Sequence, residues 1–501
     1  MLSTVAPAWT APIIDYHALA PEMVLAGGIV LIVLLDLFVS DAKKWILTPI
    51  TSFIVLGSFL PVLTLALNDG GVRSLFDGRY MVDDFSLVMK GLFLLSGYVV
   101  ILLTADHLRE GDYYQGEYWF LLLTSLLGMI MMASSRDLIS IFVSLELLSI
   151  PAYMMAAWRK RDLRSNEAGI KYYLLGVFAS ALMLYGMSLL YGISGSTKLV
   201  DISKYLGTDL TSVRALAVFF IIVGFAFKVS AVPFHTWAPD TYQGAPTPVT
   251  AFLSVASKAA GFVALVTVIF VGFPGSHDVW QPAFWILSAL TMTIGNVLAL
   301  KQTNIVRMLA YSSIAQGGFI LMPLAVAGID GVANSALRAI VTYLLVYAAT
   351  NLGVFAVVMV VARKTRSGEI SSYGGLFSYA PGVATLMTMF MASLAGIPPF
   401  GGWFGKFAAF QSLVSAGTTW AYALAIIGGL NSAVAFGYYG KILREMWMKP
   451  VPDGDTTPLT VYSSLSVALV ITSVATLVLG TFPGIALHFG DIAGLAGAFG
   501  K

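Results

Sequence analysis

Residues 247–272 read TPVTAFLSVASKAAGFVALVTVIFVG, an apolar run that contains a single charged residue, Lys258. A helix needs about 20 mostly apolar residues to cross the hydrocarbon core of a membrane, so this run predicts a spanning helix. Lys258 follows Pro248 by about 15 Å along such a helix, at a rise of about 1.5 Å per residue, and therefore lies near mid-bilayer. The stretch predicts a membrane protein with a buried cation.

The composition of the whole chain agrees with a membrane protein. Apolar residues make up 58% of the 501 residues and charged residues 11%, which is too few charges to cover a water-soluble protein of this size. Cysteine is absent, which excludes thiolate-bound iron–sulfur clusters and zinc–thiolate sites. The histidines are scattered without a metal-binding spacing, and the basic residues form no nucleic-acid surface. We therefore expect no metal, nucleotide or nucleic acid to bind this chain.

Apolar runs separated by charges and turn residues predict an all-α integral membrane protein with about fourteen transmembrane helices. Lysine and arginine are more frequent in the loops after odd-numbered spans. The positive-inside rule then places those loops in the cytoplasm and both termini on the outer face. The predicted spans are residues 18–39, 45–67, 84–105, 116–133, 137–157, 167–194, 213–230, 247–272, 279–299, 304–326, 333–362, 379–417, 420–444 and 461–483.

Two blocks of the chain share an order of features. Each runs through a Tyr-Leu-Leu helix toward a lysine beside a break: Lys228 precedes Pro233, and Lys406 follows the Pro398–Gly402 stretch. Proline disrupts a helix, so we expect helices 7 and 12 to be broken there. Five crossings is an odd number, so two tandem five-helix units are inverted relative to each other. The predicted parts are an N-terminal three-helix segment (1–110), two five-helix repeats (111–275 and 276–448), and a C-terminal helix and tail (449–501).

Four ionisable residues lie deep within predicted spans: Glu146, Lys228, Lys258 and Lys406. A charge at that depth costs several kcal/mol unless it is paired or hydrated, so each is a candidate functional residue. Burial lowers the pKa of an ammonium group and a nearby carboxylate raises it, so a lysine between these influences can release a proton. The bases are lysines and not arginines, which do not deprotonate. The row therefore predicts a proton relay, and Glu146 is expected to pair with Lys228.

Structural explanations also fit these residues. Glu146 can form a static ion pair between helices, and Lys228 and Lys406 can extend from helix ends to the membrane surface. Two further lysines, Lys90 and Lys171, lie near the beginning of a span, where the same explanation applies. Lys171 is also a candidate relay group. His235 is another, because its unperturbed pKa lies near neutrality, although a structural histidine fits its position equally well.

Four stretches of the sequence form a recognisable set: SLELLSI (144–150), PFHTWAPD (233–240), GAPTPV (244–249) and LAGIPPFGGWFGK (394–406). They closely resemble the antiporter-like membrane subunits of respiratory complex I, and the resemblance extends over roughly residues 115–445. It implies fourteen helices, of which the seventh and twelfth are discontinuous and belong to two inverted five-helix repeats. It also implies that Glu146 and Lys228 form a coupling pair, that Lys258 is the central relay lysine and that Lys406 is the exit-side group.

The resemblance implies that the chain translocates protons in a bacterial plasma membrane, driven by quinone reduction elsewhere in an NADH-quinone oxidoreductase. FMN, iron–sulfur clusters and quinone are then bound by partners, which are the other antiporter-like subunits (M and L), small membrane subunits and the peripheral arm. Subunit M typically has glutamate where Lys406 stands. Subunit L carries a lateral helix, which the sequence after residue 483 does not predict.

Two alternative functions remain open from the residues. A subunit of a cation/proton antiporter, or of a ferredoxin-driven photosynthetic or hydrogenase complex, would contain the same helices and lysines. A solute carrier that works alone would instead need a midplane cavity suited to an organic molecule.

Overall fold

The computed structural model describes residues 14–68, 71–110, 115–206 and 212–500. Its first part contains α1 (Ala20–Phe38), α2 (Leu47–Leu67), β1 (Arg73–Leu75), β2 (Tyr80–Val82), α3 (Asp84–Glu110), α4 (Gln115–Ser134), α5 (Leu138–Ala156), α6 (Leu163–Ser194), α7 (Leu199–Tyr205), α8 (Ser212–Lys228), α9 (Trp237–Gly244), α10 (Thr247–Phe252) and α11 (Lys258–Thr267). Its second part contains α12 (His277–Leu300), α13 (Ile305–Leu321), α14 (Ala333–Thr365), α15 (Leu376–Tyr379), α16 (Pro381–Ala395), α17 (Gly401–Ala416), α18 (Thr419–Met448), α19 (Ser463–Thr481) and α20 (Pro483–Ile492).

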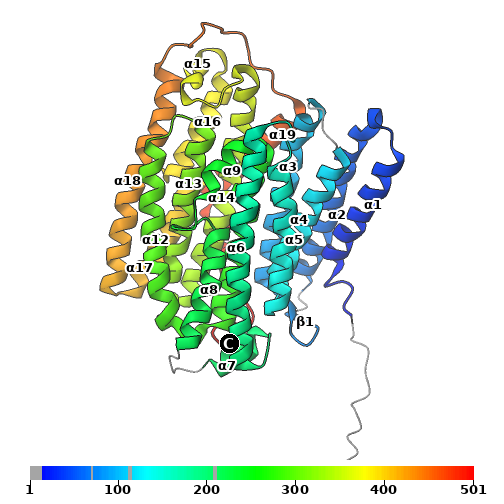
Figure 1. Ribbon diagram of the computed structural model, residues 1–501. Coiled ribbons are helices and arrows are strands. Elements are labelled where there is room, and N and C mark those ends of the chain that lie inside the picture. The colour runs from blue at the N-terminus through cyan, green and yellow to red at the C-terminus, as the bar shows by residue number, and fades with distance from the viewer. Residues whose placement is uncertain (1–13, 69–70, 111–114, 207–211, 501) are drawn as a thin grey trace, which may run out of the picture.

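The long helices stand side by side as one bundle (Figure 1). Helices α1 and α2 form one edge of the bundle, and α12, α17 and α18 form the opposite edge. Strand β1, helix α7 and the C-terminus lie at one end, and α15 lies at the other. The predicted all-α membrane architecture is confirmed.

Twelve helices of the described residues are long and apolar enough to cross a membrane. They match the predicted spans except residues 213–230 and 379–417. These two fall short because each lies at a break: α8 has 17 residues, and α16 and α17 have 15 and 16. The count of fourteen spans stays a prediction, as does the division into four parts at residues 110, 275 and 448.

Both predicted helix breaks are present. Helix α8 ends at Lys228, and the chain becomes helical again at Trp237. The Trp237 indole N–H donates to the carbonyl oxygen of Phe227 at 2.9 Å, which ties the two sides of this break together. At the second break α16 ends before Gly396, whose φ of +86° favours glycine, and α17 begins at Gly401. Each break leaves backbone carbonyls without their usual helical partners.

The centre of the bundle is the span formed by α10 and α11. A π-helical turn (Leu253–Ser257) joins these two helices, and a second (Val268–Gly272) follows α11. The apolar part of the span is entirely buried, whereas only 28% and 33% of the matching parts of the first and second spans are buried. Lysine at position 258 therefore lies in the interior of the protein and not against lipid.

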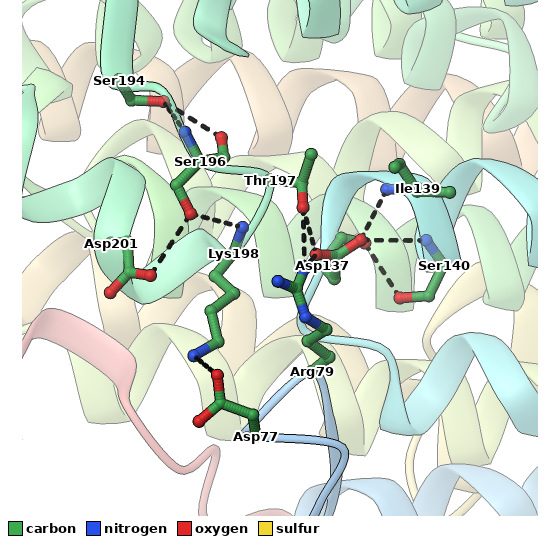
Figure 2. Close-up of polar contacts among 10 residues, drawn as sticks. All are labelled: Asp77, Arg79, Asp137, Ile139, Ser140, Ser194, Ser196, Thr197, Lys198 and Asp201. Carbon is green, nitrogen blue, oxygen red and sulfur yellow. Dashed lines mark hydrogen bonds and ion pairs between the residues drawn. The ribbon is translucent and has the colours of Figure 1, made fainter. Parts of the chain in front are cut away.

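Polar residues at the hairpin end of the bundle link the β1–β2 hairpin, the start of α5 and the connection between α6 and α7 (Figure 2). Arg79, between β1 and β2, donates to Asp137 at 2.5 Å and to Thr197 at 2.8 Å. Asp137 also caps α5, and Thr197 donates to it at 2.6 Å from the connection between α6 and α7. The Lys198 ammonium lies 2.5 Å from Asp77 and lowers the pKa of that carboxyl group. The cluster thus holds the hairpin over the end of the helices.

Candidate functional site

The first buried lysine lies directly at the break between α8 and α9. Lys228 is buried, and its Nζ donates to the hydroxyl of Ser149 on α5 at 2.8 Å. Its aliphatic chain packs on Gly261, where an added Cβ would lie 2.9 Å from Lys228 Cγ. Gly261 is three residues after Lys258 and so on the same face of that helix. The glycine therefore allows the helices that carry the two lysines to approach closely.

Glu146 and Lys228 are not in ion-pair contact, contrary to expectation. The Glu146 carboxylate accepts a hydrogen bond from Ser180 on α6 at 2.6 Å and is only partly buried. It remains near enough for an electrostatic interaction with Lys228. Lys228 instead bonds Ser149, which is one turn from Glu146 on the same face of α5.

The central lysine is held by a neighbouring helix of the second block. Lys258 is buried and donates to both the carbonyl oxygen and the hydroxyl of Ser313 on α13, at 2.9 and 2.6 Å. The π-helical turn before Lys258 is a local irregularity of a kind often found at functional sites. Two tyrosine hydroxyls, of Tyr242 and Tyr347, lie beside Ser313. Each can bond a water molecule.

A glutamine connects this region to the second break. The Gln316 side-chain amide donates to Tyr439 at 3.2 Å and to the carbonyl oxygen of Leu394 at 2.9 Å. Its carbonyl oxygen accepts from the hydroxyl of Tyr343. The hydroxyl of Tyr439 lies 2.6 Å from that of Ser312, which adjoins the serine that binds Lys258. Hydrogen-bonding groups therefore extend from one lysine toward the next.

The third buried lysine lies at the second break. Lys406 Nζ donates to the carbonyl oxygen of Ala395 at 2.9 Å, directly after the carbonyl that Gln316 binds. Gly396 makes room for the lysine, because a Cβ there would lie 2.9 Å from Lys406 Cδ. A cavity of about 10 Å³ beside Gln316 extends to Ser393, and this is about the space that one water molecule occupies.

The remaining predicted residues lie away from this row or have another role. Lys171 has a side chain that is 41% exposed, and it pairs with Glu167 at 2.6 Å and with Asp240 at 2.7 Å. His235 lies in the first break, is partly buried, and its Nδ1 has no partner among the described residues. Relay roles for Lys171 and His235 stay predictions.

The expectation that Lys90 extends to the membrane surface is wrong. Lys90 is fully buried and forms an ion pair with Glu22 at 2.8 Å. Burial also excludes surface extension for Lys228 and Lys406.

Asp240 connects α9, the helix after the first break, to α6 and to α13 by ion pairs. It lies on α9 and pairs with Lys171 on α6 at 2.7 Å and with Arg307 on α13 at 2.6 Å. Helix α9 begins at Trp237, which bonds the backbone next to Lys228. The two ion pairs therefore position the break that carries Lys228.

Asp240→Asn is expected to lower coupled turnover several-fold while destabilising the protein by roughly 1 kcal/mol, because partly exposed ion pairs contribute little to stability. The measurements are quinone-coupled activity and the midpoint of thermal unfolding. Glu167→Gln is the matched control, since Glu167 pairs with Lys171 but does not reach α9. Equal activity losses in the two variants would contradict a positioning role for Asp240.

Sequence reasoning missed the uncharged members of the row. They include Ser149, Ser313, Gln316, Tyr343 and Tyr439. A signal existed for part of this set: the segment YSSIAQGG (311–318) places polar residues one turn apart within an apolar span. The tyrosines gave no such signal, because tyrosine is common at membrane interfaces.

Comparison with known proteins identifies the family of the chain. The family model described as "NADH:quinone oxidoreductase/Mrp antiporter, TM" matches residues 135–435. The chain is 37% identical over 484 residues to NADH-quinone oxidoreductase subunit N of Trichlorobacter lovleyi, covering 96% of this chain and 97% of the relative. It is 43% identical over 407 residues to the subunit N of Moorella thermoacetica, covering 81% and 84%.

A solved structure gives the same result. One chain of respiratory complex I from Thermus thermophilus with bound aureothin superposes with a TM-score of 0.78 at 32% identity, covering 95% of this chain and 100% of that one. The chain therefore belongs to the NADH:quinone oxidoreductase/Mrp antiporter family of membrane subunits, and within it to the subunit N proteins of NADH-quinone oxidoreductase.

Proposed function

We propose that this chain translocates protons as a membrane-arm subunit of an NADH-quinone oxidoreductase, driven by quinone reduction in other subunits. One observation carries the proposal. The three lysines of the row are buried, and each bonds a hydroxyl group or a backbone carbonyl, with no carboxylate in ion-pair contact within the described residues. A buried ammonium without a fixed counter-charge is free to lose its proton when its surroundings change.

The proton route follows the order of these groups. A change in the electrostatic interaction between Glu146 and Lys228 alters the proton affinity of Lys258, whose helix packs on Lys228 at Gly261. The proton of Lys258 then passes through hydroxyl groups and water beside Gln316 to a neutral Lys406. From Lys406 the proton leaves the protein on one side of the membrane. Lys258 then takes up a new proton from the other side, which returns the row to its starting state.

The partly exposed Glu146 supports the presence of a membrane partner. A carboxylate at mid-span is costly against lipid, and a neighbouring subunit that covers this face of α5 and α6 would remove it from hydrocarbon. The partners we infer are the M and L subunits, the small membrane subunits and the peripheral arm. They hold FMN, the iron–sulfur clusters and quinone. The location is a bacterial plasma membrane, with both termini on the outer face.

Lys228→Ala is expected to lower NADH:quinone activity and proton pumping at least several-fold, while NADH oxidation with an artificial acceptor stays intact. The acceptor takes electrons from the peripheral arm, so its reduction does not depend on this chain. The measurement compares the two activities in membranes with equal amounts of assembled complex. Normal coupled pumping in the assembled variant would refute the role of Lys228.

A mild-detergent purification of the intact chain with its partners separates this function from an antiporter or hydrogenase complex. Inhibitor-sensitive NADH:quinone activity together with bound flavin is the expected result. Partners without either property would overturn the assignment, although the lysine row would remain. The solute-carrier alternative has little support, because the chain belongs to the subunit N proteins of an NADH-quinone oxidoreductase, which has several subunits.

A further inference from the structure

The N-terminal three helices contain a buried lysine–glutamate ion pair outside the lysine row. Lys90 on α3 places Nζ 2.8 Å from Oε1 of Glu22 on α1. The Lys90 side chain is 0% exposed and that of Glu22 is 11% exposed. The pair combines a glutamate and a lysine, the same two residue types as Glu146 and Lys228, but here they are in direct contact.

Tyrosine 80 covers this pair from the hairpin. The Tyr80 hydroxyl donates to Oε1 of Glu22 at 2.7 Å, and its ring centroid lies 5.4 Å from Lys90 Nζ. Burial and the neighbouring Glu22 raise the pKa of Tyr80, so its hydroxyl stays protonated and acts as a donor. Oε2 of Glu22 has no hydrogen-bond partner among the described residues, and Lys90 Nζ has no partner there besides Oε1 of Glu22. The pair thus keeps bonding capacity for a water molecule or a transferred proton.

The pair lies just inside the end of the bundle that carries the hairpin. Glu22 is in the first turn of α1, and Lys90 is about 9 Å along α3 from its first residue. The hairpin strand β1 marks this end in Figure 1. The charged groups near this pair are Arg136 and Asp83, which form an ion pair with each other at 2.7 Å. Helix α2, which packs beside α1 and α3, carries no charged residue. The pair is therefore close to the aqueous phase beyond the hairpin.

Comparison with the Arg136–Asp83 pair shows what a static connection looks like here. Arg136 bonds Asp83 and also donates to the carbonyl oxygens of Ala133 and Ser135, both at 3.0 Å. Arginine keeps its charge at all physiological pH values. Lys90 has one ionic contact, with Glu22, and its ammonium group can lose a proton. A static link between α1 and α3 needs neither a lysine nor a carboxylate, because an apolar pair of similar volume is often at least as stable.

We propose that Glu22 and Lys90 form an additional proton-binding site of this chain, which exchanges one proton with the aqueous phase at the hairpin end of the bundle. On release, the Lys90 ammonium becomes a neutral amine and its proton passes by way of the Glu22 carboxylate to water beyond Tyr80. On uptake, the same steps run in reverse. The inference rests on the proposed function, because its test measures proton translocation by the complex.

The test compares neutral and charged variants of the whole complex in proteoliposomes, with protons moved per NADH as the readout. Glu22→Gln and Lys90→Met each leave one buried charge without a partner, so both are expected to reduce the amount of assembled complex. The double variant Glu22→Gln/Lys90→Met leaves no such charge and is expected to assemble normally. It is nevertheless expected to move about half as many protons per NADH or fewer, because the site can no longer bind a proton.

Lys90→Arg supplies the second comparison, because it keeps the ion pair but cannot release a proton. It is expected to show the same pumping loss as the double variant. Wild-type pumping by the assembled double variant would overturn the inference and leave the pair a static link. Lys258→Met in the same assay tests the proposed function separately: if that variant also pumps normally, proton translocation by this chain fails, whatever the Glu22–Lys90 variants show.

Discussion

Lys258→Met is expected to stop proton translocation through this chain while the complex still assembles. The methionine side chain fills most of the lysine volume in a fully buried span and leaves no charge without a partner, so the fold is retained. Methionine cannot bind the proton that Lys258 passes on toward Lys406. Coupled NADH:quinone turnover and pumping should fall by about tenfold or more. A tenfold loss corresponds to an increase of about 1.36 kcal/mol in the barrier to proton transfer from position 258. NADH oxidation with an artificial acceptor should continue.

Two control variants make this result specific. Lys301→Met changes an exposed lysine between α12 and α13 and should pump normally. Lys258→Arg keeps a positive charge near Ser313 but cannot release a proton, so it should be as inactive as the methionine variant. Normal pumping by an assembled Lys258→Arg protein would show that charge alone is needed and would contradict the relay.

Gln316→Leu is expected to have the second-largest effect, because it removes the connection between the central lysine and the second break. Leucine has nearly the same size but loses the bonds to Tyr439, Tyr343 and the carbonyl of Leu394. The Tyr343 hydroxyl then loses its buried partner, which costs about 1–3 kcal/mol of folding free energy, whereas Tyr439 keeps its hydrogen bond to Ser312. Pumping should fall several-fold with Lys258 and Lys406 unchanged. The measurements are protons moved per NADH and the thermal unfolding midpoint.

Asn296 provides the matched control for Gln316. Its side-chain amide group donates to Asn431 at 3.1 Å and accepts from the Tyr438 hydroxyl at 2.9 Å, which joins α12 to α18. Within the described part of the chain, Asn296 bonds none of the three lysines of the row. Asn296→Leu should therefore lower stability by a similar amount and leave the proton-to-NADH ratio unchanged. If both variants lower that ratio equally, the loss at Gln316 is one of stability alone.

The membrane architecture could be read from the sequence because its signals are local. Apolar run length identified the span at 247–272, and the residues around Pro233 and Gly401 identified the two helix breaks. The buried lysines could be found for the same reason, since a charge within an apolar run is visible without knowing which helices meet.

Contacts between helices could not be predicted in this way. Lys228 bonds Ser149 instead of Glu146, and which side chain it meets depends on the rotation of α5 against α8. Lys90 has a sequence position suited to surface extension, yet α1 places Glu22 beside it. A position along one helix gives the depth of a residue in the membrane, but burial is decided by helices that are distant in the chain.

The burial of residues 248–272 has a consequence for biogenesis. A newly inserted helix of this composition is stable in lipid by itself, apart from the single charge of Lys258, which adds about 2.5–3.5 kcal/mol to its insertion. The bonds that satisfy this charge come from Ser313, on a helix that is synthesised later. The N-terminal half of the chain therefore remains incompletely folded until α13 has entered the membrane. Cutting the chain between these helices should yield a first fragment that stays exposed to quality-control proteases until the second is supplied.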